Sequence, residues 1–158
     1  MSSVNTCEKF HAYLADLDSR LAKLSELLKR KLTAVEKFDL SGLESIMKEE
    51  QAYILISNGF DKSIDEFRDM LGLDARKLGD MIEELPQDER PRFRETYRTL
   101  KVSLDEVKAL NEKCQVLIEE RLYSLDKAIK EIDRAAGASY GEEGKRNTNQ
   151  TSLMNQSV

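Results

Sequence analysis

The sequence predicts an all-α protein: an elongated antiparallel helical bundle, built as a coiled-coil-like hairpin of three long helices plus one short helix, with a disordered C-terminal tail. Two observations lead to this fold class. Charged residues make up 35% of the 158 residues, whereas there are only 7 glycines and 2 prolines, a composition unlike that of β-sandwiches or barrels. Apolar side chains also recur in steps of three and four residues, which is the spacing of one face of a helix.

The first expected helix covers residues 6–38. Asn5 and Glu8 have the spacing of a capping box at its start. Its narrow apolar stripe, interrupted only by Lys31, is typical of a coiled-coil-like contact. The stripe consists of Phe10, Leu14, Leu17, Leu21, Leu24, Leu28, Val35 and Phe38.

The second expected helix starts near Ser41, which forms another capping-box pair with Glu44, and ends at Gly72. Gly59 lies within it and weakens it by roughly 1 kcal/mol relative to alanine. This glycine marks either a kink or a close helix contact. The apolar positions of the helix are Leu43, Ile46, Met47, Tyr53, Ile54, Phe60, Ile64, Phe67 and Leu71.

A short third helix follows, with Asp74 as its expected cap and Pro86 as its end. It carries Leu78, Met81, Ile82 and Leu85. After a turn, Asp88 is the expected cap of the fourth helix, and Pro91 is tolerated in its first turn.

The fourth helix is the longest, at roughly 45 residues and about 65 to 70 Å. A rod of this length does not bury its apolar stripe alone, so it must lie against the first two helices or against a partner. The stripe consists of Phe93, Tyr97, Leu100, Leu104, Val107, Asn111, Cys114, Ile118, Leu125, Ile129 and Ile132, and is widened by Leu110, Val116, Leu117 and Leu122.

The composition changes at Gly137. Residues 137–144 are rich in glycine, and residues 145–158 are mostly asparagine, glutamine, serine and threonine. Such a segment has too little apolar area to offset the entropy of ordering it. We therefore expect residues 1–136 to form one helical domain and residues 137–158 to form a flexible tail.

The residue types argue against several function classes. Acidic residues exceed basic ones by 30 to 25, a net charge of −5, so we expect no nucleic-acid partner. The single histidine, His11, has a metal-ligand spacing to Glu8 but no second such pair, and Cys7 and Cys114 have no catalytic companion. We expect no enzymatic activity, no metal and no cofactor. Two distant cysteines make no disulfide framework, residues 1–6 are polar and no apolar run reaches about 18 residues, so we expect a cytoplasmic protein without direct membrane insertion.

Two features go beyond a plain bundle. The apolar band of the fourth helix is wide around Leu117 and Leu122, and either the short third helix covers it or it forms a groove for the amphipathic helix of a partner. Tyr140 is an aromatic residue alone in a polar tail. Either it anchors the tail in a pocket of another protein, or it has no role.

A string of residues in the last third of the chain forms a recognisable pattern. It consists of Leu110-Asn111, Val116-Leu117-Ile118-Glu119, Leu122, Ala128-Ile129, Ile132 and Tyr140-Gly141-x-x-Gly144. This pattern resembles that of the FlgN family of flagellar export chaperones, which typically shows a Leu-Asn pair, a pair of apolar residues, an Ala-Leu step and a Tyr-Gly-x-x-Gly segment. The chain departs from the pattern at Cys114-Gln115, where the family often has Asn-Gly.

The resemblance implies an export chaperone that binds the C-terminal amphipathic helix of hook-associated (hook–filament junction) proteins and delivers them to the type III export gate. It assigns Tyr140 to docking on the cytoplasmic domain of that gate. The alternative is a coiled-coil adaptor or structural homo-oligomer without chaperone activity; the client and the oligomeric state stay open. The client-binding residues that the resemblance implies are Leu110, Asn111, Val116, Leu117, Ile118, Leu122, Leu125, Ile129 and Ile132.

Overall fold

The computed structural model describes residues 3–137, which form five helices and no strand. This confirms the all-α fold class. The tail expected at residues 137–158 lies outside the described residues, apart from Gly137. In the described part of the chain, no helix combines the length and apolarity needed to cross a bilayer. The helices are α1 (Ser3–Glu36), α2 (Leu40–Asn58), α3 (Phe60–Leu71), α4 (Leu78–Glu83) and α5 (Arg90–Ala135).

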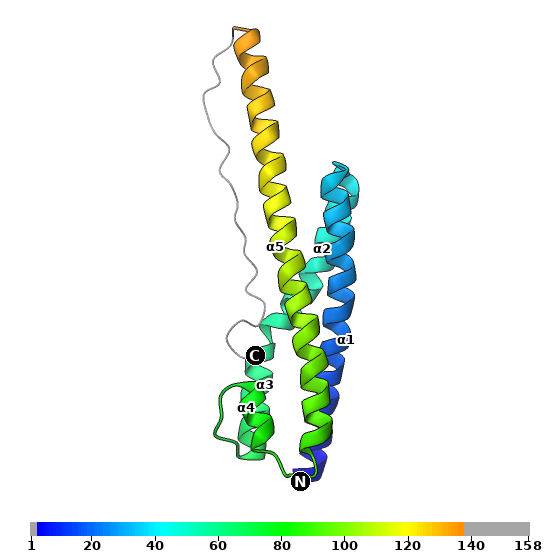
Figure 1. Cartoon of the computed structure of the whole chain (residues 1–158), viewed down its shortest axis with the longest axis vertical. Coiled ribbons are helices and arrows are strands. Elements are labelled where there is room, and N and C mark those ends of the chain that lie inside the picture. Colours follow the sequence, from blue (N-terminus) through cyan, green and yellow to red (C-terminus); the bar gives the residue numbers. More distant parts are fainter. Residues whose placement is uncertain (1–2, 138–158) are drawn as a thin grey trace.

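The chain runs along α1, returns along α2 and α3, and then sets out again along α5 (Figure 1). The largest helix–helix interface joins α1 to α5. Five side-chain hydrogen bonds between these helices join residues 84 to 86 positions apart, and the ion pair of Lys29 with Glu106 joins residues 77 positions apart. A nearly constant offset means that α1 and α5 are parallel. The expected antiparallel packing therefore holds for α1 against α2 and α3, whereas the main interface is parallel, because α2 and α3 carry the chain back to the beginning of α1.

The α1–α5 interface buries the stripes that the sequence predicts. On α1, seam residues from Phe10 to Leu28 are almost fully buried. On α5, Phe93, Leu100, Leu104 and Val107 are too, whereas Tyr97 is half-buried. Aromatic rings close the base of the bundle: Phe10 stacks on Phe67 of α3, with 4.8 Å between ring centroids. The short helix α4 adds Leu78, Met81 and Ile82 to the same core.

Lys31, the exception in the α1 stripe, is buried and forms an ion pair with Glu50 of α2. The Lys31 Nζ lies 2.9 Å from one carboxylate oxygen of Glu50 and 3.2 Å from the other. A charged side chain is tolerated in the seam because its partner is buried with it and accepts its hydrogen bonds.

Gly59 divides the second expected helix into α2 and α3. Its N–H bonds to the carbonyl of Ile56, three residues back, and its φ and ψ are −83° and −6°. This tighter turn interrupts the series of i to i−4 backbone hydrogen bonds at the end of α2. Glycine is suited to such an interruption, because it loses more conformational entropy than any other residue when it is ordered inside a helix.

The turn between α1 and α2 is closed by Phe38 and Asp39. Phe38 adopts a left-handed conformation with φ 54°, and its N–H and that of Asp39 bond to the carbonyls of Val35 and Ala34. This is a Schellman motif, in which the left-handed position is usually glycine. The Asp39 carboxylate then accepts the N–H of Gly42 at 2.9 Å.

Four capping predictions are wrong, because the helices begin at other residues than the polar side chains predicted to cap them. Asp39 caps α2 in place of Ser41, and α1 begins at Ser3, so that Asn5 is inside the helix. The caps of α4 and α5 are Lys77 and Glu89, rather than Asp74 and Asp88. The prediction for the end of α3 is confirmed, since Gly72 is its left-handed cap with φ 66°.

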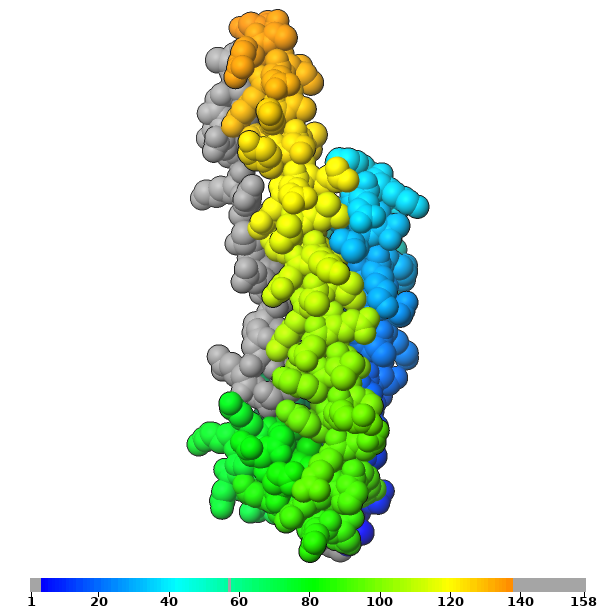
Figure 2. All heavy atoms as spheres, in the orientation of Figure 1, coloured from blue at the N-terminus to red at the C-terminus, as the bar shows by residue number. Residues whose placement is uncertain are grey.

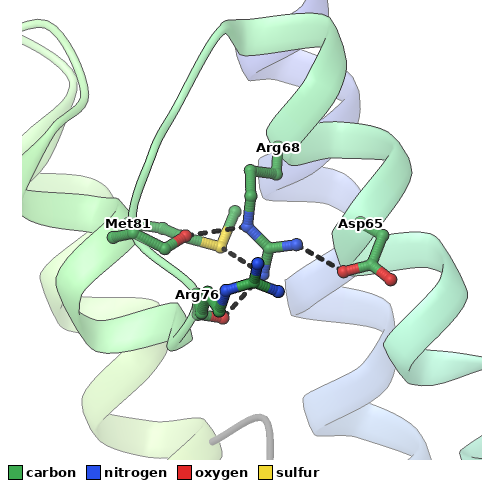
Figure 3. Close-up of polar contacts among 5 residues, drawn as sticks. Asp65, Arg68, Arg76 and Met81 are labelled. Atoms are coloured by element: carbon green, nitrogen blue, oxygen red, sulfur yellow. Dashed lines mark hydrogen bonds and ion pairs between the residues drawn. The ribbon is translucent and has the colours of Figure 1, made fainter.

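Arg68 of α3 holds the loop between α3 and α4 (Figure 3). Its Nε donates to the carbonyl of Ala75 at 2.7 Å and one Nη to the carbonyl of Arg76 at 2.6 Å, while the other Nη is paired with Asp65. From the other side, the Glu84 carboxylate accepts the N–H groups of Asp74 and Ala75. The loop thus has a fixed path that brings α4 back onto the core.

Candidate functional site

The distal part of α5 extends beyond the helix that covers the rest of it. Arg121 of α5 donates to the carbonyl of Glu36, the last residue of α1, at 3.4 Å. Residues 122–135 of α5 therefore continue about 20 Å past the end of α1 at 1.5 Å per residue. Figure 2 shows this segment, which we call the distal segment, standing clear of the α1–α2 corner.

The apolar stripe of α5 does not stop where α1 ends. Its steps of three and four residues pass from the buried Val107 and Cys114 through Ile118 and Arg121 to Leu125 and on to Ile132. Leu125 and Ile132 are 53% and 67% exposed. The distal segment thus keeps the face that binds α1 in the proximal half, but without a helix against it in the described chain.

An apolar hollow of about 130 Å³ lies where the distal segment leaves the α1–α2 corner. Arg121 stands at its edge with its guanidinium 4.9 Å from the centre of the Phe38 ring. This hollow is suited to apolar side chains, because Arg121 and Asp39 are the only charged residues that line it among residues 3–137. Its apolar wall includes Val35, Phe38, Leu40, Leu43, Leu122 and Leu125.

The structure separates the nine residues predicted to bind a client. Leu110 packs against the core, and Asn111 and Leu117 are half-buried beside the seam. Val116 is exposed, but at 100° per residue it points away from its seam neighbours Cys114 and Ile118. The remaining five lie at or beyond the end of α1: Ile118, Leu122 and Leu125 line the hollow, and Ile129 and Ile132 follow along the distal segment.

Sequence reasoning missed the contribution of the corner residues Phe38, Leu40 and Leu43 to this hollow. Phe38 was expected as one more residue of the first helical stripe. Only the left-handed turn at its backbone places its ring beside α5, and a phenylalanine gives little signal of such a turn, because positive φ is unusual for bulky residues. Tyr140, the predicted gate-docking residue, lies outside the described residues.

The histidine and the two cysteines, considered above as candidate metal-ligating or catalytic residues, have packing roles in the structure. His11 Nε2 is 2.8 Å from the Thr96 hydroxyl, so the histidine joins α1 to α5. Burial raises the pKa of the thiols of Cys7 and Cys114, which keeps both in the unreactive protonated form. Among residues 3–137, no group of three or more His, Cys, Asp or Glu is placed to hold a metal ion.

Comparison with known protein families gives a match that covers nearly the whole chain. The model of the FlgN family, described as FlgN protein, matches residues 1–148. This chain belongs to the FlgN family. Searches of curated proteins and of solved structures returned no match. FlgN proteins are chaperones of flagellar export rather than enzymes, and the chain is therefore assigned to flagellar export as a chaperone.

Proposed function

We propose that this chain is a cytoplasmic chaperone that binds the C-terminal amphipathic helix of hook-associated proteins on the distal segment of α5. It prevents their premature aggregation or assembly and delivers them to the type III export gate. Family membership supports hook-associated proteins as the clients. The observation that carries the assignment to this surface is the exposed continuation of the α5 stripe past the end of α1.

The physical basis of the activity is the covering of apolar surface. A client terminus that is unfolded before assembly exposes apolar side chains, and a helix face with matching side chains buries them. Ordering the client costs a few kcal/mol of the interaction energy, which keeps the complex reversible. Release at an export gate requires that reversibility.

The test is a double substitution, Leu125→Asp with Ile132→Asp, in the full chain. Both side chains are exposed, so the helical content at 222 nm should stay close to that of the wild type. Two carboxylates set against an apolar client face should weaken binding at least about a hundredfold. The probe is a peptide of the last ~30 residues of a hook-associated protein from the same genome, measured by calorimetry, the length being about that of a helix and its flanks.

Val102→Asp is the matched control, because Val102 lies on the same helix and is 63% exposed but faces away from the α1–α5 seam. It should bind the peptide like the wild type. An unchanged affinity of the double variant would contradict the proposed surface. A wild-type oligomer that is stable on dilution and does not bind the peptide would favour the adaptor alternative.

Delivery is proposed to depend on Tyr140, in the Tyr-Gly-x-x-Gly segment that resembles the family pattern. Tyr140→Ala should leave the affinity for the client peptide unchanged and reduce binding to the purified cytoplasmic domain of the export gate. Tyr140→Phe, which keeps the ring, should retain most of the gate binding if the apolar body of the side chain is the anchor. Equal gate binding by the alanine variant and the wild type would refute this role.

A further inference from the structure

We propose that the α1–α2 corner, with Phe38 at its tip, forms one end of the client site, so that a client helix lies on α5 in the path that α1 vacates. This inference rests on the proposed function and deepens it. It places the client in line with α1 and adds to the site a residue that lies more than 80 positions before the distal segment in the sequence.

The register of α1 on α5 is the first argument. The offset of 84 to 86 residues is maintained from Glu8 opposite Arg92 to Glu36 opposite Arg121. Because the α5 face packs against α1 in one register over this length, it can pack against another straight helix with apolar residues in steps of three and four. The same face of α5 continues through Leu125 to Ile132, and a helix with this apolar spacing is the partner that fits it.

The backbone of Phe38 is the second argument. With φ 54° it stands in the left-handed position of the Schellman motif, where glycine avoids the strain that a side chain causes. The fold alone therefore favours glycine at this position. A strained conformation held by its surroundings points to a role for the side chain beyond folding.

The placement of the Phe38 ring is the third argument. The ring is held by the Arg121 guanidinium at 4.9 Å, yet the residue is 58% exposed and lines the hollow. Leu122 and Leu125 line the same hollow from α5. An aromatic side chain has only two rotatable bonds, so ordering it on binding costs little conformational entropy, which is the property of an interface anchor.

These observations define the occupant by its pattern. It is an amphipathic helix of at least about 11 residues, with three or four apolar residues in steps of three and four. The apolar residue at one end of this helix fills the hollow between Phe38 and Leu125, and the others lie along the distal segment as far as Ile132. The client segment that binds should show this spacing and should lose affinity when the hollow-filling residue is replaced by aspartate.

The experiment compares Phe38→Gly with the wild type, using the same C-terminal peptide of a hook-associated protein as probe. Glycine relieves the left-handed strain and removes the ring, so the melting temperature should be unchanged or higher while the Kd rises about tenfold. Val102→Ala, which removes an exposed apolar side chain far from the hollow, is the control and should change the Kd by less than twofold.

A second readout does not depend on the stability of the glycine variant. Benzoylphenylalanine in place of Phe38 should form a photo-crosslink to the bound peptide, and the same group in place of Val102 should not. A crosslink to a second copy of the chain instead of the peptide would overturn the inference.

The outcomes separate this inference from the proposed function. If the wild type binds the peptide and Leu125→Asp with Ile132→Asp abolishes binding, but Phe38→Gly leaves the Kd within twofold, the corner is not part of the site and the proposed function stands. If the wild type binds no such peptide, both fail. A tenfold loss with Phe38→Gly at an undiminished melting temperature supports both.

Discussion

Replacing Lys31 by methionine tests how the α1–α2 pair is held together. The Lys31 and Glu50 side chains are only 11% and 10% exposed, and their charged atoms are 2.9 Å apart. Removing one partner leaves the other charge buried and unpaired, which costs about 3 to 5 kcal/mol of unfolding free energy. For a helical body of this size, this corresponds to a fall of about 10 to 18 °C in melting temperature.

A neighbouring ion pair supplies the control. Arg30 and Glu49 join the same two helices one residue away, but their side chains are 59% and 54% exposed and 3.4 Å apart. Water and salt screen such a pair, so Arg30→Met should cost less than about 1 kcal/mol. The contrast between Lys31→Met and Arg30→Met isolates the effect of burial, because the helices and the type of substitution are the same.

The assay is urea unfolding followed by ellipticity at 222 nm, and a double variant completes it. Lys31→Met with Glu50→Leu replaces both charges by apolar groups of similar size and should recover wild-type stability or exceed it by about 1 to 4 kcal/mol. A single variant that loses under about 1 kcal/mol, or a double variant as unstable as the single, would refute the view that the loss comes from an uncompensated buried charge.

Three further predictions concern the fold. Gly59→Ala should raise the unfolding free energy by about 0.4 to 1 kcal/mol, because Gly59 has a right-handed conformation and an added Cβ meets only one atom at ordinary contact distance; a loss in urea unfolding would contradict this. Arg68→Lys should speed hydrogen exchange in residues 72–77, since an ammonium group does not reproduce the fork that binds two loop carbonyls. Burial raises the pKa of the Cys7 and Cys114 thiols above the ordinary value of 9.0, so their contribution to stability is complete below that pH and is lost as pH rises past it. Thiols titrate roughly between pH 8 and pH 10. Over this range, the unfolding free energy of the wild type should therefore fall more than that of a variant with alanine at both positions.

Helical periodicity was enough to predict the long elements. The stripe expected over residues 6–38 corresponds to α1 at Ser3–Glu36, and the fourth expected helix of roughly 45 residues corresponds to α5 with 46. These predictions hold because an apolar face is a local property of the sequence, repeated many times along each helix. The burial of Lys31 in this stripe is explained by its ion pair with Glu50. Glu50 lies on another helix, so the periodicity of α1 does not predict this partner.

Features that depend on the path of the whole chain could not be predicted from the spacing of apolar residues. The parallel packing of α1 and α5 follows from the return of the chain along α2 and α3, and no stripe encodes its direction. Whether Gly59 would break or only weaken its helix also depends on packing around it. The client-binding residues stay a prediction, although the structure separates Leu110, in contact with the core, from Leu125 and Ile132, which are exposed.

The division of α5 into a covered and an uncovered part also bears on how a client would be captured. An isolated segment as short as residues 122–135 is only marginally helical in water, because nucleating a helix is costly. Here the nucleus already exists: α1 fixes α5 as far as Arg121, and each further turn only propagates the helix. The apolar side chains of the distal segment are thus presented in register before any partner arrives. The cost of ordering on binding then falls on the client alone, so the affinity depends mainly on the client's own tendency to form a helix with the matching spacing.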